Sequence, residues 1–583
     1  MIIRPVFQLL LLMFCTLGVY YPTIFAPFNS LDDQLLVNQL LNQHGFELSR
    51  HFSPGGTYDY FRPLLTLSFE LDKYVGGLQE TFMHFVNVLL HSINVLLVYL
   101  LALRFCKLDQ QKAGWIPFTA AALFAVHPIN SEAVNWIMGR TDILAGVFVF
   151  LSLIFLIRAF EKQSNLWLIG SALTFFLGAL CKETALFMIP GACFLLLCHA
   201  EPHLRSWRGR WMTPAYYGIA ILGYFSLRWN AFQVDRGVEF TNKVVSNVVE
   251  TATQPALAAQ SETATLFDLV TTLLKASGFY FTKLLQPLPL NFAIHRIESY
   301  YIVPGVILLL LLVWLAWRRK LVGWIMIVSA SIAVSALFVV LTGLAWTPLA
   351  ERYMYIPCGV LMVGLVSGSA MRLRKMAIER LGMLIVTLLI FLSGWVTANR
   401  NIVWQDNLTL YQDTVQKAPG FAPAVNELAV ALRARNRHEE ANQLLSSNQM
   451  PVSDNAMINK AVYYWEQGDY PAARDHLIQL LKVAPDNQKT RILEKLVDIT
   501  TQYSNDIDNE ALKQNGYRDI LGWLERITAI STTGFNYYRI GRVHLVLGDK
   551  ESAQTAFARA AELFPEDSLY KKPAEKLARD LAK

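Results

Sequence analysis

Long apolar runs recur through the first two thirds of the chain and stop near residue 399. A helix needs roughly 20 apolar residues to cross the hydrocarbon core of a bilayer, and these runs are close to that length. After residue 399, charged residues and helix formers are interleaved throughout. The pattern predicts an all-α protein with a multi-pass membrane domain over residues 1–398 and a soluble helical domain over residues 399–583.

About eleven runs qualify as membrane-spanning helices. The first is longer than the core of a typical signal peptide, so we interpret it as a retained span. The predicted spans are 6–26, 81–103, 114–134, 142–157, 165–181, 184–199, 212–229, 302–317, 321–343, 353–370 and 381–398. One further apolar stretch, Leu266 to Leu290, contains two lysines. We interpret it as a re-entrant or interfacial helix.

Lysine and arginine gather in the short loops that join these spans, for example at 318–320 and 372–380. Cytoplasmic loops of membrane proteins carry an excess of these residues. The bias therefore places the N-terminus in the cytoplasm and the long loops 27–80 and 230–301 on the opposite face. An odd number of spans places the C-terminal domain on that same non-cytoplasmic face.

The C-terminal domain contains a sequence repeat. Residues 455–487 and 534–567 each have Gly-Asp at a turn, Ala five residues after that Gly, and a proline near the end. This is a tetratricopeptide pattern, and residues 422–449 carry a weaker copy. The 80 residues from Ala473 to Ala553 leave room for two degenerate helix pairs. Such pairs stack into a solenoid, which usually holds another protein. The alternative is that this domain is a packed helical cap that binds no ligand.

Composition supports the membrane interpretation and excludes one class of partner. Hydrophobic residues make up 54% of the chain and charged residues 16%, which is unusual for a soluble protein. The net charge of +6 lies mostly in short loops. Because no basic face is concentrated, nucleic acid is not an expected partner. The six cysteines show neither a disulfide framework nor metal-ligand spacing.

Two adjacent carboxylates, Asp32 and Asp33, follow the first predicted span. Such a pair at the outer interface can provide a general base and an acceptor or metal contact. Neighbouring side chains do not share a helix face, so we expect different roles for the two. The alternative is a helix capped by Asn29 or Ser30 with acids in its first turn. A divalent metal stays open, since no full ligand set is visible.

The second predicted span carries a polar stripe that consists of His84, Asn87, His91 and Asn94. At 100° per residue these side chains fall on one face of a helix. We predict that they line or adjoin a polar site. The alternative is hydrogen bonding between helices.

Further ionisable groups stand at the predicted membrane boundaries, where charges are costly and therefore indicate sites. They are Glu132, Arg140, Asp142, Lys182, Glu183, Glu351 and Arg352, with Tyr355 beside them and Arg62 in the first long loop. Arg352, Lys182 and Arg62 are cations placed where a lipid-linked phosphate would lie. The alternative is ion pairing between sequence neighbours, Lys182 with Glu183 and Arg352 with Glu351.

Six short motifs occur in a fixed order along the chain: DDQ after the first span, YFRPLLTLSFELD, HFVNVLLHSINVLL, HPINSEAVNWIMGRTDILAG, CKETALF and AERYMYIP. This series resembles the transmembrane-and-tetratricopeptide O-mannosyltransferases of the GT-C glycosyltransferase superfamily. The C-terminal repeats match the architecture of that family too, so the resemblance covers most of the chain.

The resemblance implies a fold and a reaction. It implies a GT-C-like membrane domain that transfers a sugar, typically mannose, from a polyprenyl-phosphate donor to a protein Ser/Thr hydroxyl with inversion. By the family pattern, Asp32 or Asp33 would be the general base. Arg352, and after it Arg62 and Lys182, would stabilise the leaving phosphate. The lipid-linked sugar is the expected donor substrate, and no other cofactor is implied.

The repeat array is shorter than in animal members of that family, which indicates a bacterial protein. We therefore expect it in the inner membrane, with the repeats holding an acceptor protein in the periplasm. Sugar and acceptor stay open, because fold does not determine them. A GT-C transferase acting on lipid A or polysaccharide and a non-enzymatic scaffold that recruits envelope proteins are the alternatives.

Overall fold

The computed structural model describes most of the chain. Excluded are residues 1–2, 31–32, 42–44, 53–59, 199–207, 232–265, 295, 343–346, 348, 373–375, 420, 447–460, 462–463, 466–467, 485, 531, 565–567, 569 and 583. The chain forms two compact units, Met1–Ala418 and Pro419–Lys583. The described residues are helical with no strand, apart from one isolated bridge between Ile294 and Leu349. The predicted all-α fold class is confirmed, and the functional boundary at residue 398 stays a prediction.

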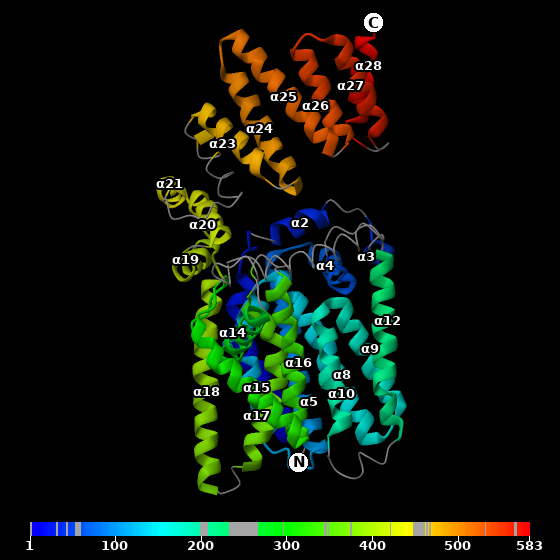
Figure 1. Cartoon of the computed structure of the whole chain (residues 1–583), viewed down its shortest axis with the longest axis vertical. Helices are drawn as coiled ribbons and strands as arrows, with labels where there is room; N and C mark the ends of the chain where they lie inside the picture. The colour runs from blue at the N-terminus through cyan, green and yellow to red at the C-terminus, as the bar shows by residue number, and fades with distance from the viewer. Residues whose placement is uncertain are drawn as a thin grey trace. The chain divides into compact units, whose positions relative to one another are not determined.

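The first unit is a bundle of apolar helices (Figure 1). Seven helical segments in the described part are long and apolar enough to cross a membrane: Pro5–Phe25, Glu80–Leu108, Ile137–Lys162, Ser299–Arg318, Leu321–Thr342, Glu351–Ala370 and Leu381–Val403. They overlap α1 (Ile3–Tyr20), α5 (Glu80–Leu108), α8 (Arg140–Lys162), α15 (Ile302–Arg318), α16 (Leu321–Thr342), α17 (Tyr355–Arg372) and α18 (Met376–Val403). This is a membrane protein.

The other four predicted spans also fall on helical segments, which are shorter or less apolar. They are α6 (Ile116–Ala125), α9 (Asn165–Cys181), the segment Glu183–Leu197 that contains η4 (Glu183–Phe187) and α10 (Met188–Phe194), and α12 (Thr213–Ala231). The total of eleven spans therefore stays a prediction.

The stretch interpreted as re-entrant or interfacial forms α14 (Leu266–Leu285). It packs against α15 with the two backbones in contact: a Cβ atom at Gly278 would lie 1.9 Å from the carbonyl oxygen of Tyr301. One at Gly305 would lie 2.1 Å from the carbonyl oxygen of Leu274. Only glycine fits at both positions, so this crossing fixes α14, and with it Lys283, against the bundle.

Short elements lie at the end of the bundle opposite the N-terminus (Figure 1). They are α2 (Asp33–Leu41), α3 (Leu48–Phe52) and α4 (Pro63–Gly76). Pro63 suits the first turn of α4 because its missing N–H is not needed there, and Gly77 ends that helix in the left-handed conformation. The short helix α7 (Ser131–Asn135) and the 3-10 turn η8 (Glu351–Met354) complete the elements that carry the predicted site residues.

The described helices of the second unit are α20 (Ala422–Ala434), α21 (His438–Ser446), α23 (Tyr470–Val483), α24 (Asp486–Asp506), α25 (Glu510–Ile530), α26 (Gly534–Val546), α27 (Lys550–Leu563) and α28 (Lys571–Leu581). Helices α23 to α28 pack in sequence, and α20 packs against α21. The last helix of the first unit, α19 (Asn407–Lys417), precedes them.

The predicted Gly-Asp turns have the geometry that their residues favour. Gly468 and Gly548 adopt positive φ angles of 78° and 81°, which suit glycine. The carboxylates of Asp469 and Asp549 then accept backbone N–H groups of Ala472 and Ser552 and cap α23 and α27.

One expectation for the repeats was wrong. The chain between α23 and α26 forms a single pair of helices, α24 and α25, instead of two degenerate pairs. Each of these helices has 21 residues, whereas α26 has 13, so one long pair uses the available chain. Their apolar positions, such as Leu496 and Trp523, continue one shared core without a break.

Candidate functional site

The ionisable residues singled out from the sequence lie at helix ends and in turns of the first unit. Asp33 begins α2, Arg140 and Asp142 begin α8, and Lys182 follows α9. Glu351 and Arg352 form the turn η8. Asp32 lies outside the described residues. Nearly all of these charges are buried, so each must find a partner.

Arg140 is the most deeply buried cation among the predicted site residues, with no exposed surface. Its guanidinium lies 2.6 Å from the carboxylate of Asp72 on α4. It also donates to the side chain of Asn87 at 2.8 Å and to the carbonyl oxygen of Met83 at 2.9 Å. Asp33, itself buried, interacts electrostatically with this guanidinium. Two carboxylates therefore face one cation.

Lys182 pairs with Asp142, two residues after Arg140, at 2.6 and 2.7 Å. Its ammonium also lies 5.1 Å from the ring centre of Tyr353. Electrostatic interactions connect it with Arg62 and Arg352. Lys182 therefore interacts with both of the other cations that the sequence analysis predicted to bind a phosphate.

Arg352 forms a buried ion pair with Glu132 of α7, and its backbone N–H donates to the same carboxylate at 3.1 Å. The guanidinium packs over the rings of Trp136 and Tyr353, at 4.7 and 4.9 Å from their centres. Aromatic faces favour a cation in this position. The charge of Arg352 is thereby held in one orientation.

Arg62 and Arg228 of α12 share Glu183, at 2.9 and 3.3 Å. All three side chains are partly exposed. Glu351 pairs instead with Lys283 of α14 at 2.9 Å and accepts the backbone N–H of Asn291 at 3.1 Å. These contacts connect the end of α14 with η8.

The alternative of pairing between sequence neighbours was therefore wrong. Lys182 bonds Asp142 rather than Glu183, and Arg352 bonds Glu132 rather than Glu351. Adjacent side chains in an extended or turn backbone point in different directions, so each charge reaches a separate element. Every one of these ion pairs joins two different segments of the chain.

The polar stripe of α5 makes hydrogen bonds between elements. His91 contacts the hydroxyl of Tyr355 at 2.8 Å, and Asn94 donates to the same hydroxyl at 3.0 Å. Asn87 bridges Arg140 and the carbonyl oxygen of Trp136. His84 lies 3.4 Å from the carbonyl oxygen of Pro27. Of the stripe, Asn87 adjoins the Arg140 cluster, and His91 and Asn94 join helices.

Three charged residues of these clusters were not singled out from the sequence as site candidates: Asp72, Arg228 and Lys283. Arg228 and Lys283 stand within apolar segments, where the cost of a charge could have identified them. Asp72 lies in a mixed polar segment, where a carboxylate is ordinary and gives no such signal.

Burial and neighbouring charges alter the proton affinity of two groups in these clusters. Burial lowers the pKa of Lys182 to about 8; Asp142 opposes this shift, and Arg62 and Arg352 add to it. Burial also raises the pKa of Asp72, although the adjacent Arg140 opposes the rise. Among the described residues, no group of three His, Cys, Asp or Glu side chains is placed to hold a metal ion.

The first turn of α8 separates two chemically different clusters. Arg140 faces the carboxylates of Asp72 and Asp33, whereas Asp142 faces Lys182 and the other cations. The unpaired N–H groups and the dipole of a helix N-terminus also favour an anion. The arrangement can hold a phosphate on one side of this turn and a basic carboxylate on the other.

Two family models match parts of the chain. A family model described as dolichyl-phosphate-mannose-protein mannosyltransferase matches residues 63–229, and a tetratricopeptide repeat model matches residues 536–567. Parts of the chain are thus similar to mannosyltransferases and to tetratricopeptide repeats. The segment matched by the mannosyltransferase model includes Asp72, Glu132, Arg140, Asp142 and Lys182.

Three curated relatives illustrate the similarity. Protein O-mannosyl-transferase TMTC2 of Homo sapiens is 39% identical over 133 residues, which cover 22% of this chain and 15% of the relative. TMTC4 of Homo sapiens is 36% identical over 159 residues, covering 24% and 21%. Tmtc1 of Drosophila melanogaster is 35% identical over 143 residues, covering 24% and 16%. The alignments thus span about a fifth or less of these relatives.

Among solved structures, yeast Tom70 aligns with 82% of this chain and 95% of its own, at 12% identity and a TM-score of 0.25. No conclusion is drawn from so low a score.

Replacing Asp142 by Asn tests the buried pair with Lys182. The substitution leaves a buried ammonium without its counter-charge, and we expect a loss of about 3–5 kcal/mol of stability. The double variant D142N/K182M should recover part of the loss. Thermal unfolding in detergent measures both. As a control, E562Q removes a partner from the exposed pair Arg559–Glu562 and should change the midpoint little. Equal midpoints for D142N and E562Q would contradict the account.

Proposed function

We propose that this protein is a membrane glycosyltransferase that transfers mannose from a polyprenyl-phosphate donor to Ser or Thr hydroxyls of proteins. The observation that carries the proposal is that Lys182, paired at 2.6 Å with Asp142 in the first turn of α8, also interacts electrostatically with Arg62 and Arg352. A fixed group of cations in a poorly solvated site stabilises a leaving phosphate more strongly than water does. Homology to protein O-mannosyl-transferases supports the choice of sugar and acceptor.

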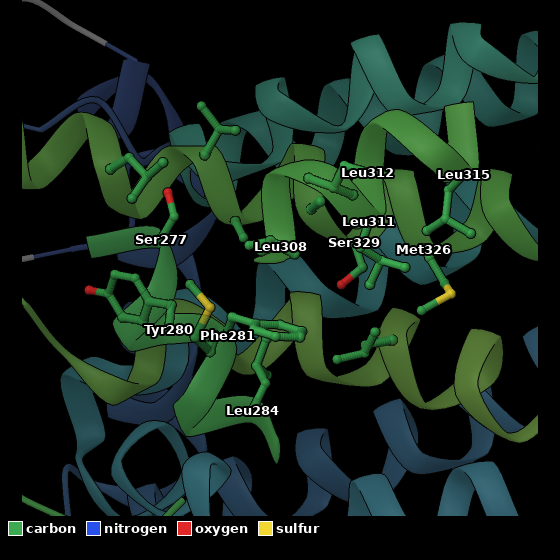
Figure 2. A pocket seen from close by; sticks show the side chains of 16 residues that line it. Ser277, Tyr280, Phe281, Leu284, Leu308, Leu311, Leu312, Leu315, Met326 and Ser329 are labelled. Carbon is green, nitrogen blue, oxygen red and sulfur yellow. The ribbon is translucent and has the colours of Figure 1, made fainter. Parts of the chain in front are cut away.

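The proposal of a lipid-linked donor is supported by an apolar cavity of about 130 Å³ (Figure 2). Leucines of α15 and side chains of α14 and α16 line it, for example Leu308, Tyr280 and Ser329. Met354, two residues after Arg352, also lines the cavity, and the hydroxyl of Tyr280 accepts the backbone N–H of Ala350 at 3.3 Å. A polyprenyl chain in this cavity would therefore carry its phosphate close to η8.

We assign the general base to Asp33. It is buried, and it interacts electrostatically with Arg140. In the proposed step the carboxylate takes the proton of the acceptor hydroxyl while the hydroxyl oxygen attacks C1 of the sugar. The bond between C1 and the phosphate oxygen breaks, and its electron pair leaves with the polyprenyl phosphate. Attack opposite to the leaving group inverts the anomeric centre.

We also propose a membrane location and a binding partner for the second unit. The Lys/Arg bias of the short loops supports a cytoplasmic N-terminus. We propose the inner membrane of a bacterium, with the repeats in the periplasm, on the basis of the short repeat array. Tetratricopeptide helices usually hold a protein segment. We therefore propose that the second unit binds the acceptor protein on the side of the membrane where Asp33 lies.

Separate substitutions of the two adjacent aspartates test the base. D33N should lower the rate of transfer from radiolabelled polyprenyl-phosphate mannose to protein by a factor of about 10²–10⁴, the usual contribution of a general base. D32N, which makes the same change one residue away, should retain most of the activity. Full activity in D33N together with an inactive D32N would move the base to Asp32. Full activity in both would remove the base from this pair.

The pH dependence of transfer tests Lys182. Its ammonium is charged below its pKa of about 8 and neutral above it. Activity should therefore fall as the pH rises through about 8, because one phosphate-binding cation is lost. In K182R the guanidinium stays charged, so the alkaline limb of the rate profile should move to higher pH. An alkaline limb at the same pH in K182R and wild type would exclude Lys182 as its cause.

A further inference from the structure

The buried Tyr411 of helix α19 contacts the segment that leads into α2. The hydroxyl of Tyr411 donates to the side-chain oxygen of Asn29 at 2.8 Å, and the hydroxyl of Ser30 donates to Tyr411 at 3.3 Å. Tyr411 has no exposed surface, and only 4% of Asn29 is exposed. This contact connects positions that are 382 residues apart in the chain.

Asn29 is bonded in turn to Asp33. Its backbone N–H donates to the Oδ2 atom of Asp33 at 2.9 Å, and the backbone N–H of Asp33 donates to the carbonyl oxygen of Asn29 at 3.3 Å. The two residues thus close a reciprocal loop at the start of α2. Any shift of Asn29 would move the carboxylate of Asp33 with it.

Helix α19 is itself bonded at both ends to loops of the first unit. Asp406 caps its first turn. Lys417 at its end donates to the carbonyl oxygen of Leu290 at 2.7 Å, and Asn407 donates to the carbonyl oxygen of Phe28 at 2.9 Å. Because these bonds come from both ends of the helix, α19 offers a fixed position for the Tyr411 hydroxyl.

We propose that Tyr411 is a positioning residue that orients the carboxylate of Asp33 through Asn29. The proposal rests on the proposed role of Asp33 as general base. A base transfers a proton efficiently only when its oxygen stands within hydrogen-bond reach of the reacting hydroxyl. A buried carboxylate that is not fixed in this way adopts unproductive orientations for part of the time.

The same bonds affect the proton affinity of the base. A backbone N–H that donates to a carboxylate favours its charged form. If the loss of the Tyr411 hydroxyl loosens Asn29, that donation weakens and the carboxylate holds its proton up to a higher pH. The acid limb of the rate profile then moves upward. A residue that only supports packing would not produce this shift.

Tyr411→Phe is the test, because it removes the hydroxyl and keeps the ring that packs near Phe292, 6.3 Å away. Full-length wild type and variant are assayed with polyprenyl-phosphate mannose and a membrane-protein fraction from cells that lack this protein. We expect kcat to fall about tenfold, the effect of one lost hydrogen bond. The KM for the donor should stay unchanged, and the acid limb should move to higher pH.

Thr414→Val is the matched control. Thr414 is a second buried hydroxyl on α19, but it bonds the carbonyl oxygen of Leu410 within the helix at 2.7 Å. Its loss should leave kcat and the pH profile near those of wild type. Asn29→Ala should reproduce the effect of Tyr411→Phe, and the double variant should be no worse than either single one, since both remove the same bond.

Three results would overturn the inference. The first is a Tyr411→Phe variant with wild-type kcat and an unmoved acid limb, although D33N is inactive. The second is an equal loss of activity in Thr414→Val, which would indicate a general effect on α19. The third is additive losses in the double variant. Full activity in D33N would instead refute the proposed base, so the two failures are distinguishable.

Discussion

Buried charge is the constraint on which the membrane unit depends. A charge that leaves water for the interior costs several kcal/mol unless a partner compensates it. Arg140, Lys182 and Arg352 are all buried, and each is held by a carboxylate from a different segment. These pairs therefore join α4, α7, α8, the turn after α9 and η8. A fold that separated these segments would leave charges without partners, so the site and the bundle depend on the same contacts.

The first turn of α8 lies between two clusters of opposite charge in the candidate site. Arg140 and Asp142 are two residues apart and point to different partners, one toward carboxylates and the other toward cations. A phosphate ester and a nucleophile need these two environments close together but distinct. The partly exposed group of Arg62, Glu183 and Arg228 has two cations for one carboxylate.

Many of the helices and candidate site residues could be predicted from the sequence, whereas the contacts between them could not. Apolar length predicted the long spans, and the Gly548-Asp549 turn was predicted because each residue has a local conformational preference. The cations Arg352 and Lys182 were predictable because charge at a membrane boundary is rare. Their pairing with Glu132 and Asp142 was not predictable, because tertiary packing determines which side chains meet. Asp72 ends the motif YFRPLLTLSFELD, but its pairing with Arg140 likewise depends on tertiary packing. The number of repeats was misjudged because α24 and α25 are longer than the repeat period implies.

The proposed function is the attachment of a hexose to proteins. Intact mass spectrometry of membrane and secreted proteins, from cells with and without the gene, measures this attachment. We expect some proteins to lose hexose-sized mass increments in the deletion strain and to regain them when wild type is restored. Identical protein masses in both strains, with a hexose lost from a lipid or polysaccharide instead, would refute the proposed function.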